Sequence, residues 1–183
     1  MANPEHLAIL KQGVEIWNNW KKDNPEITVD LSNTKLIDLD LSNIDLSNAI
    51  LSNTDCKNTK FEDSKLWSVN FNHANLEHTS FISAVLLGCN FQHARLTNSH
   101  LFQANAFEAD FSYANLYLAS FAYSELSRTK FIKTYSRKAD FSYTFLRDAN
   151  FYQSDLENAN FTQAHVLGTN FNQTCLTGIC IDE

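Results

Sequence analysis

The hydrophobic residues of this chain recur at every fifth position from residue 29 to residue 183. Each position from Leu31 onward whose number ends in 1 or 6 is the middle of a five-residue unit, and almost all of these are Leu, Phe, Val or Ile. The departures are Cys56, Ala106 and Ser136. The residue two places before each middle is never charged. A short repeat this strict predicts a solenoid, in which each unit packs against its neighbours.

The period of five predicts a turn in every unit, because it matches neither the 3.6-residue period of a helix nor the two-residue period of a strand. Residues one coil apart should stack at roughly 4.8 Å, where opposite charges are favourable. At a separation of 20 residues the repeat contains eight opposite-sign pairs and no like-sign pair. We therefore expect four units per coil. The pairs are Lys35/Asp55, Asp40/Lys60, Asp45/Lys65, Lys57/Glu77, Glu108/Arg128, Asp110/Lys130, Arg128/Asp148 and Arg137/Glu157.

The middle positions alternate between two sizes of side chain. From Phe61 onward, middles whose numbers end in 1 are Phe, except Leu101 and Ile181, and those ending in 6 are mostly Leu. With four units per coil, Phe occupies two opposite faces of the core and Leu the other two, which lets the layers fill without voids. We expect the core to be looser near Ser136, whose buried hydroxyl needs a backbone acceptor.

Several units resemble the A(D/N)LxX signature of the pentapeptide-repeat family. The clearest are Ala74-Asn75-Leu76, Ala109-Asp110-Phe111, Ala114-Asn115-Leu116 and Ala159-Asn160-Phe161. The resemblance covers residues 29–183, which we take as one β-helix domain. It implies an all-β solenoid, a right-handed quadrilateral (four-sided) parallel β-helix of about 7–8 coils. The handedness comes only from the resemblance.

The amino-terminal residues 1–28 are expected to form a capping helix and a linker. Apolar residues fall at helical spacing over residues 4–22, Asn3 is a suitable N-cap, and Pro25 ends the segment. We expect one helix to cover the first coil, because an open solenoid edge invites self-pairing. The segment is similar to caps in cyanobacterial members of the family. The alternative is a docking helix for a partner. The expected cap residues are Leu10, Val14, Trp17 and Trp20.

The carboxy-terminal end of the repeat shows no comparable cap. Ile179 and Ile181 are core positions with no further coil in the sequence. The family resemblance adds that gyrase-binding members dimerise through this end. A homodimer formed end to end, through Ile179 and Ile181, is therefore one hypothesis for this chain.

Composition excludes several classes of protein. The 183 residues carry a formal net charge of −7, which argues against direct nucleic-acid binding. No apolar stretch approaches the length of a membrane span, and the first residues do not form a secretory signal. The four cysteines match no zinc pattern, and reduced thiols account for them. We therefore predict a cytoplasmic protein with no membrane partner.

Candidate chemistry in the sequence is weak. His73 and His93 lie one coil apart in one outward column, but the column offers no obvious third metal ligand. A straight solenoid with a filled core presents no concave pocket for catalysis. We predict no catalytic residue, cofactor or metal, and therefore no enzyme. Asp and Asn recur just before the middle residue, where we expect them to hydrogen-bond the turns. Examples are Asp30, Asp40, Asn75, Asn90, Asp110 and Asn150.

Outward apolar residues gather on part of the exterior. Trp67, Leu87 and Phe107 recur at intervals of 20 in one column, and Ile82 and Phe102 do so in the next. A contiguous apolar surface of this kind is typical of a contact site. The alternative is that these side chains stabilise the outer sheet through cross-strand contacts. The complete candidate interaction patch is Trp67, Ile82, Val85, Leu87, Phe102, Phe107, Tyr123 and Tyr143.

Two functions are compatible with these patterns. The first is a non-enzymatic scaffold, regulatory in one form, that binds an unidentified protein. The second, which the family resemblance suggests, is a DNA mimic that binds a topoisomerase such as DNA gyrase. A rod of about 37 Å would need about 22 net charges to match duplex DNA. Residues 29–183 carry 17 acidic and 11 basic residues, a net charge of −6, so the mimicry is poor.

Overall fold

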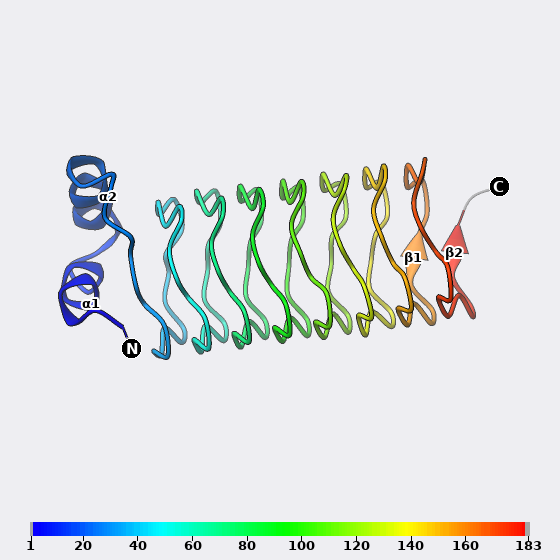
Figure 1. The fold of residues 1–183 in the computed structure, drawn as a ribbon, viewed down its shortest axis with the longest axis horizontal. Helices are drawn as coiled ribbons and strands as arrows, with labels where there is room; N and C mark the ends of the chain where they lie inside the picture. The colour runs from blue at the N-terminus through cyan, green and yellow to red at the C-terminus, as the bar shows by residue number, and fades with distance from the viewer. Residues whose placement is uncertain (1, 182–183) are drawn as a thin grey trace.

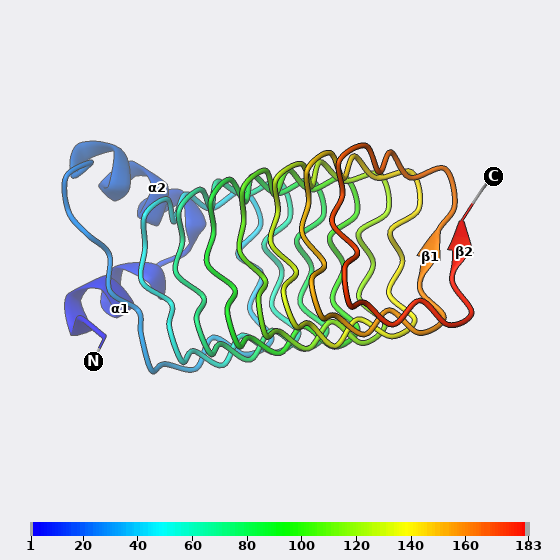
Figure 2. The same cartoon turned by 45° about the vertical axis from the view of Figure 1, so that its right-hand side comes forward.

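The protein is a rod of stacked coils with two helices at its amino-terminal end (Figure 1). The computed structural model describes residues 2–181. The helices are α1 (Pro4–Leu10) and α2 (Val14–Asp23), and the strands β1 (Asn160–Phe161) and β2 (Cys180–Ile181) lie at the opposite end. Figure 2 shows the same coils from a second side, each lying beside the next along the rod. The end of the predicted repeat domain, Asp182 and Glu183, lies outside the described residues.

Successive coils pair in parallel at a constant separation of 20 residues. Single bridges run from Asp30↔Ile50 to Asp155↔Cys175, and β2 pairs with β1 in the register Asn160↔Cys180. Four units per coil is therefore confirmed. The expected all-β solenoid is built mainly from isolated parallel bridges, since β1 and β2 are the only strands within residues 2–181. A turn in every unit leaves only one or two extended residues, too few for a longer ladder.

The expected charge pairs help to join the coils. Four of them are ion pairs: Lys57–Glu77 at 3.8 Å, Arg128–Glu108 at 3.1 Å, Lys130–Asp110 at 3.8 Å and Arg137–Glu157 at 2.7 Å. Three others, Lys35/Asp55, Asp40/Lys60 and Asp45/Lys65, are partners across β-bridges. Arg137 also contacts Asp155 at 2.7 Å, and this hydrogen bond is the main reason that its pKa is raised. These exposed pairs set the register more than they add stability.

Each unit turns in the same way. The amide of Ala49 donates to the carbonyl of Leu46 at 2.9 Å, and every fifth residue from Asn33 to Gly178 has a positive φ, as the third position of a type II turn requires. The residue before the middle supports the turn. The Asp30 carboxylate accepts from the Ser32 amide at 2.8 Å, a contact that lowers the Asp30 pKa.

The same side-chain contact recurs for the other Asp and Asn residues that the sequence pattern singled out. The acceptors are Asp40, Asn75, Asn90, Asp110 and Asn150. Their predicted structural role is therefore confirmed. Because they recur around the whole rod, these carboxylates and amides do not mark one chemical site.

Phenylalanine forms two stacked ladders inside the rod. Phe91 and Phe111 stack at 4.5 Å in one ladder, and Phe121 and Phe141 stack at 5.0 Å in the other. The two ladders meet edge to face, as Phe111 and Phe121 do at 5.5 Å and 88°. This is the expected placement of Phe on opposite faces, and it fills the centre of the core with favourable aromatic geometries.

The core is not looser around Ser136. Its hydroxyl is fully buried and donates to the Thr134 hydroxyl at 2.9 Å, which itself donates to the Phe131 carbonyl at 3.0 Å. The bridges on either side of this layer continue without a break. The prediction of a direct backbone acceptor was wrong, since the Thr134 hydroxyl accepts from Ser136 and passes the hydrogen bond on to the backbone.

The predicted single helix over residues 4–22 is two helices. The chain leaves the helical conformation at Gly13, whose φ is 105°, a value that favours glycine. The Asn3 side chain accepts from the Glu5 amide at 2.9 Å, as expected of an N-cap. The break at Gly13 lets α1 and α2 fold back on each other, so that both lie over the first coil (Figure 2).

The helices pack on the core through the residues that the sequence pattern singled out. Leu10 and Trp17 are buried with the first leucines of the repeat, and Val14 and Trp20 are partly buried against them. The Trp17 indole N–H donates to the Asp45 carbonyl at 2.7 Å. The contact joins α2 to the first coil and satisfies both polar groups.

Candidate functional site: an exterior aromatic surface

The first column of the candidate patch follows the rod axis. The carbonyls of Trp67, Leu87 and Phe107 each accept a backbone hydrogen bond from the preceding coil, at 3.0, 2.7 and 3.0 Å. Their side chains are therefore one coil apart and in register. Trp67 is 41% exposed. On the Leu87 coil, Val85 pairs with Lys65 and Asn105 on the two sides, which places it beside this column.

Two tyrosines of a neighbouring column extend the surface beyond the second column. Phe102 meets Tyr123 edge to face at 5.4 Å, and Tyr123 stacks on Tyr143 at 4.6 Å and 4°. These contacts join the two tyrosines to Phe102. Ile82, Val85 and Leu87 belong to one coil, with Ile82 in the second column and Leu87 in the first. We call the eight residues of the candidate patch the aromatic surface.

The stacking determines which atoms of the rings a partner can reach. Tyr123 is 50% exposed, yet one face of its ring is covered by Tyr143. Tyr123 therefore keeps a partly exposed ring that carries a hydroxyl group. Such a side chain can lose water on its apolar part while still hydrogen-bonding a partner, as interface tyrosines do. The same stack also stabilises adjacent coils, so both interpretations of these residues have a geometric basis.

Further exposed side chains outside the candidate patch lie toward the carboxy-terminal end. Phe145 stacks on His165 at 4.9 Å and 4°, and Leu167 is 73% exposed. The separation of 20 residues between Phe145 and His165 was the signal available in the sequence. A side chain in an outward column predicts a stacked neighbour even where the two residue types differ.

The stacked histidines lie as close as expected. His73 and His93 are 4.8 Å apart between ring centres, His93 stacks on Tyr113 at 4.9 Å, and the Lys133 ammonium lies 5.8 Å from the Tyr113 ring centre. Within residues 2–181 no third His, Cys, Asp or Glu joins the pair to form a group that could hold a metal ion. The column is an aromatic stack that ends in a cation–π contact.

The four cysteines are free thiols of two kinds. Cys56 and Cys89 are buried in the core, where desolvation raises the pKa of each thiol to about 12. Both are therefore protonated and unreactive at neutral pH. Cys175 and Cys180 are exposed on the last coil.

The last described coil leaves core positions open. Ile181 is 47% exposed, and Leu176 is also exposed although both are middles of their units. Ile179 packs against the core but is only partly buried. Within residues 2–181, no element covers this edge as α1 and α2 cover the other (Figure 1).

No helix in the described part of the chain is long and apolar enough to cross a membrane.

Comparison with known proteins identifies the repeat. The model of the family described as pentapeptide repeats matches in eight copies, over residues 30–67, 68–101, 99–135 and 139–179. No curated protein matches this chain.

Several solved structures of pentapeptide repeat and related proteins are similar to this chain. QnrB1, a plasmid-mediated fluoroquinolone resistance protein, is 20% identical, with 85% of this chain and 91% of that chain covered and a TM-score of 0.54. This similarity shows a shared fold. HetL, a pentapeptide repeat protein involved in heterocyst differentiation regulation from the cyanobacterium Nostoc sp. strain PCC 7120, is 26% identical, with 82% and 75% covered and a TM-score of 0.42. Rfr23 from the cyanobacterium Cyanothece 51142 is 21% identical, with 68% and 60% covered and a TM-score of 0.36.

Proposed function

The chain belongs to the pentapeptide-repeat family, and from this premise we propose that it is a non-enzymatic scaffold that binds a protein partner through the aromatic surface. The observation that carries the proposal is the continuous ring contact of Phe102, Tyr123 and Tyr143 within that surface. The proposed scaffold is right-handed, with about 7–8 coils, as the family resemblance implies. We place it in the cytoplasm, where its free thiols would stay reduced.

The composition of the aromatic surface supports a protein partner. Aromatic residues are enriched at the centres of protein interfaces, whereas Lys, Glu and Asp are depleted there. The eight side chains of the aromatic surface carry no charge. Their rigid placement also lowers the entropy lost on binding, because stacked rings on a solenoid have few conformations to lose.

A triple substitution tests the aromatic surface. The native protein should retain a partner from an extract of its own cells. The variant with Ser in place of Leu87, Phe102 and Phe107 should no longer retain it. The readout is quantitative mass spectrometry of the retained proteins. A matched control replaces Leu118 and Tyr135 by Ser. Both side chains are also exposed but lie in other columns, so this variant should retain the partner. Loss of the partner in both variants, or in neither, would reject the aromatic surface as the site.

The open carboxy-terminal edge supports a second contact, an end-to-end homodimer through Ile179 and Ile181. A second copy would cover the exposed Leu176 and Ile181 side chains and pair their backbone edges. We expect sedimentation velocity to show a dimer whose fraction rises with concentration. Ile181 replaced by Lys should shift it to monomer, whereas Leu167 replaced by Lys, outside the core layer, should not. Monomer at every concentration would contradict the dimer.

The alternative function is DNA mimicry toward a topoisomerase such as gyrase. The shared fold with QnrB1, a fluoroquinolone resistance protein, is the observation that favours it. The net charge of −6 on residues 29–183 opposes it, because duplex DNA of the same length carries about 22 charges. A supercoiling assay at saturating protein separates the two functions, since the scaffold proposal predicts neither inhibition nor protection of gyrase.

A further inference from the structure

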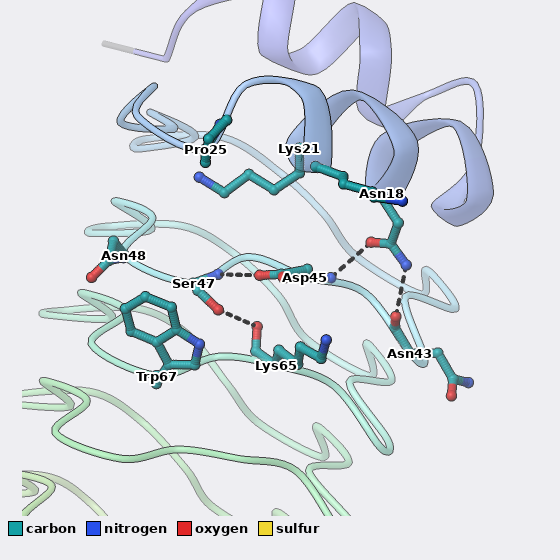
Figure 3. Close-up of a pocket in the computed structure, with 10 residues that line it drawn as sticks. Asn18, Lys21, Pro25, Asn43, Asp45, Ser47, Asn48, Lys65 and Trp67 are labelled. Carbon is teal, nitrogen blue, oxygen red and sulfur yellow. Dashed lines mark hydrogen bonds between the residues drawn. The ribbon is translucent and has the colours of Figure 1, made fainter.

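A concave site lies where α2 meets the first two coils, apart from the protein surface discussed above except for one shared residue, Trp67. The cavity has a volume of about 410 Å³, within the range of small-molecule sites. Figure 3 shows α2 above it, the coil segment that carries Asp45 and Ser47 behind it, and Trp67 below. The lining residues are Asn18, Lys21, Lys22, Pro25, Asn43, Asp45, Ser47, Asn48, Lys65 and Trp67.

The site is held in shape by hydrogen bonds between α2 and the first coil. The Asn18 side chain donates to the Asn43 carbonyl at 2.9 Å and accepts from the Asp45 amide at 2.9 Å. Asp45 in turn accepts from the Ser47 amide at 3.1 Å. These contacts, drawn in Figure 3, tie the upper wall to the rear wall. A ligand would therefore meet a preformed cavity, which reduces the entropy lost on binding.

The site concentrates positive charge in an acidic protein. Lys21, Lys22 and Lys65 line it, against the single carboxylate of Asp45. Lys21 is only 8% exposed, and its ammonium donates to the Ile27 carbonyl at 3.2 Å. No ion pair of Lys21 occurs within residues 2–181. An anion in the cavity would therefore give Lys21 a counter-charge that these contacts do not supply.

The lower wall of the site is the indole of Trp67. Its 41% exposure distinguishes it from Trp17, which is buried. An exposed indole below a group of lysines offers a flat ring for stacking and ammonium groups for an anion. Neither an aliphatic acid nor a free phosphate would use both walls.

We propose that this site binds a phosphorylated nucleoside, with the phosphate among Lys21, Lys22 and Lys65 and the base against Trp67. Base–aromatic stacking tolerates any base, so the proposal commits to the ligand class and not to one nucleotide. The side chains of Asn18 and Asn48 also border the cavity.

The test is calorimetric titration of the full chain with adenosine monophosphate, inorganic phosphate and adenosine. The monophosphate should bind at least roughly tenfold more tightly than either fragment, and rising salt should weaken it. Lys22 and Lys65 both replaced by Gln should lower its affinity roughly tenfold or more. The control, Lys57 and Lys60 both replaced by Gln, removes the same two charges outside the site and should leave affinity unchanged.

Variants of Trp67 separate nucleotide binding from simple anion binding. Trp67 replaced by Ala should weaken the monophosphate roughly fivefold or more while leaving phosphate unaffected. Trp67 replaced by Phe should keep most of the affinity but lose the tryptophan fluorescence change seen with the native chain. Three results would overturn the proposal: no binding at millimolar monophosphate, equal affinity for phosphate and monophosphate, or full affinity in the Ala variant.

Discussion

Replacing Phe111 by Ala is expected to lower the free energy of unfolding by about 3–5 kcal/mol. Phe111 is fully buried and contacts rings on three sides, with Phe91 at 4.5 Å, Phe131 at 5.3 Å and Phe121 at 5.5 Å. Neighbouring coils cannot close on the vacated space, because the backbone ladder holds them at a fixed spacing. The measurement is urea denaturation followed by circular dichroism.

Two matched substitutions make this result specific to the Phe ladder. Phe145 is exposed, so its replacement by Ala should change stability by less than about 1 kcal/mol. Phe111 replaced by Leu should cost less than Ala, because Leu101 already occupies an equivalent layer on the opposite face. An equal effect of Ala at Phe111 and Phe145 would contradict the assignment of the ladder as the core.

Replacing Trp17 by Ala is expected to lower the free energy of unfolding by about 3–5 kcal/mol and to promote association of the protein. Trp17 is fully buried against the first coil, and its N–H holds the Asp45 carbonyl at 2.7 Å. Its loss opens a cavity and removes the hydrogen bond that joins its indole to the first coil. Thermal unfolding and light scattering measure the two effects.

A graded series at this position distinguishes packing from hydrogen bonding. Trp17 replaced by Phe keeps most of the apolar contact but leaves the Asp45 carbonyl without the indole N–H donor. This loss should lower the free energy of unfolding by about 1–3 kcal/mol. Ile16 lies on the exposed side of the same helix, so its replacement by Ala should be nearly neutral. If the Trp17 variant were as stable as the Ile16 variant, α2 would not be the cap of the first coil.

The repeat was predictable because its contacts recur at one sequence separation. The spacing of Lys57 and Glu77 in the sequence indicates the coil length, and the structure places the Lys57 ammonium 3.8 Å from the Glu77 carboxylate. The outward columns follow from the same count, which is why Trp67, Leu87 and Phe107 could be aligned in advance. Ser136 departs from the pattern, and the prediction of a looser core with a backbone acceptor was wrong there. Its hydrogen-bond acceptor is the Thr134 hydroxyl, whose direction the repeat does not specify.

The candidate sites were only partly predictable. The aromatic surface required the diagonal contact of Phe102 with Tyr123, which lies between two columns and has no simple spacing. The cavity beside Trp67 could not be anticipated, since it depends on how α2 crosses the coil. Gly13 was the one local signal that the helix breaks, and helical periodicity on both sides of it obscured that signal.

The sequence by itself determined the solenoid, the 20-residue coil and the division of Phe and Leu between faces, because each unit meets the same neighbours at the same separation. Only the tertiary structure decided how the two helices lie over the first coil, which outer rings touch and where a cavity opens. The reason is physical: contacts inside a periodic rod are set by register, whereas the angle of a cap is set by the packing of Trp17 and the hydrogen bonds of Asn18.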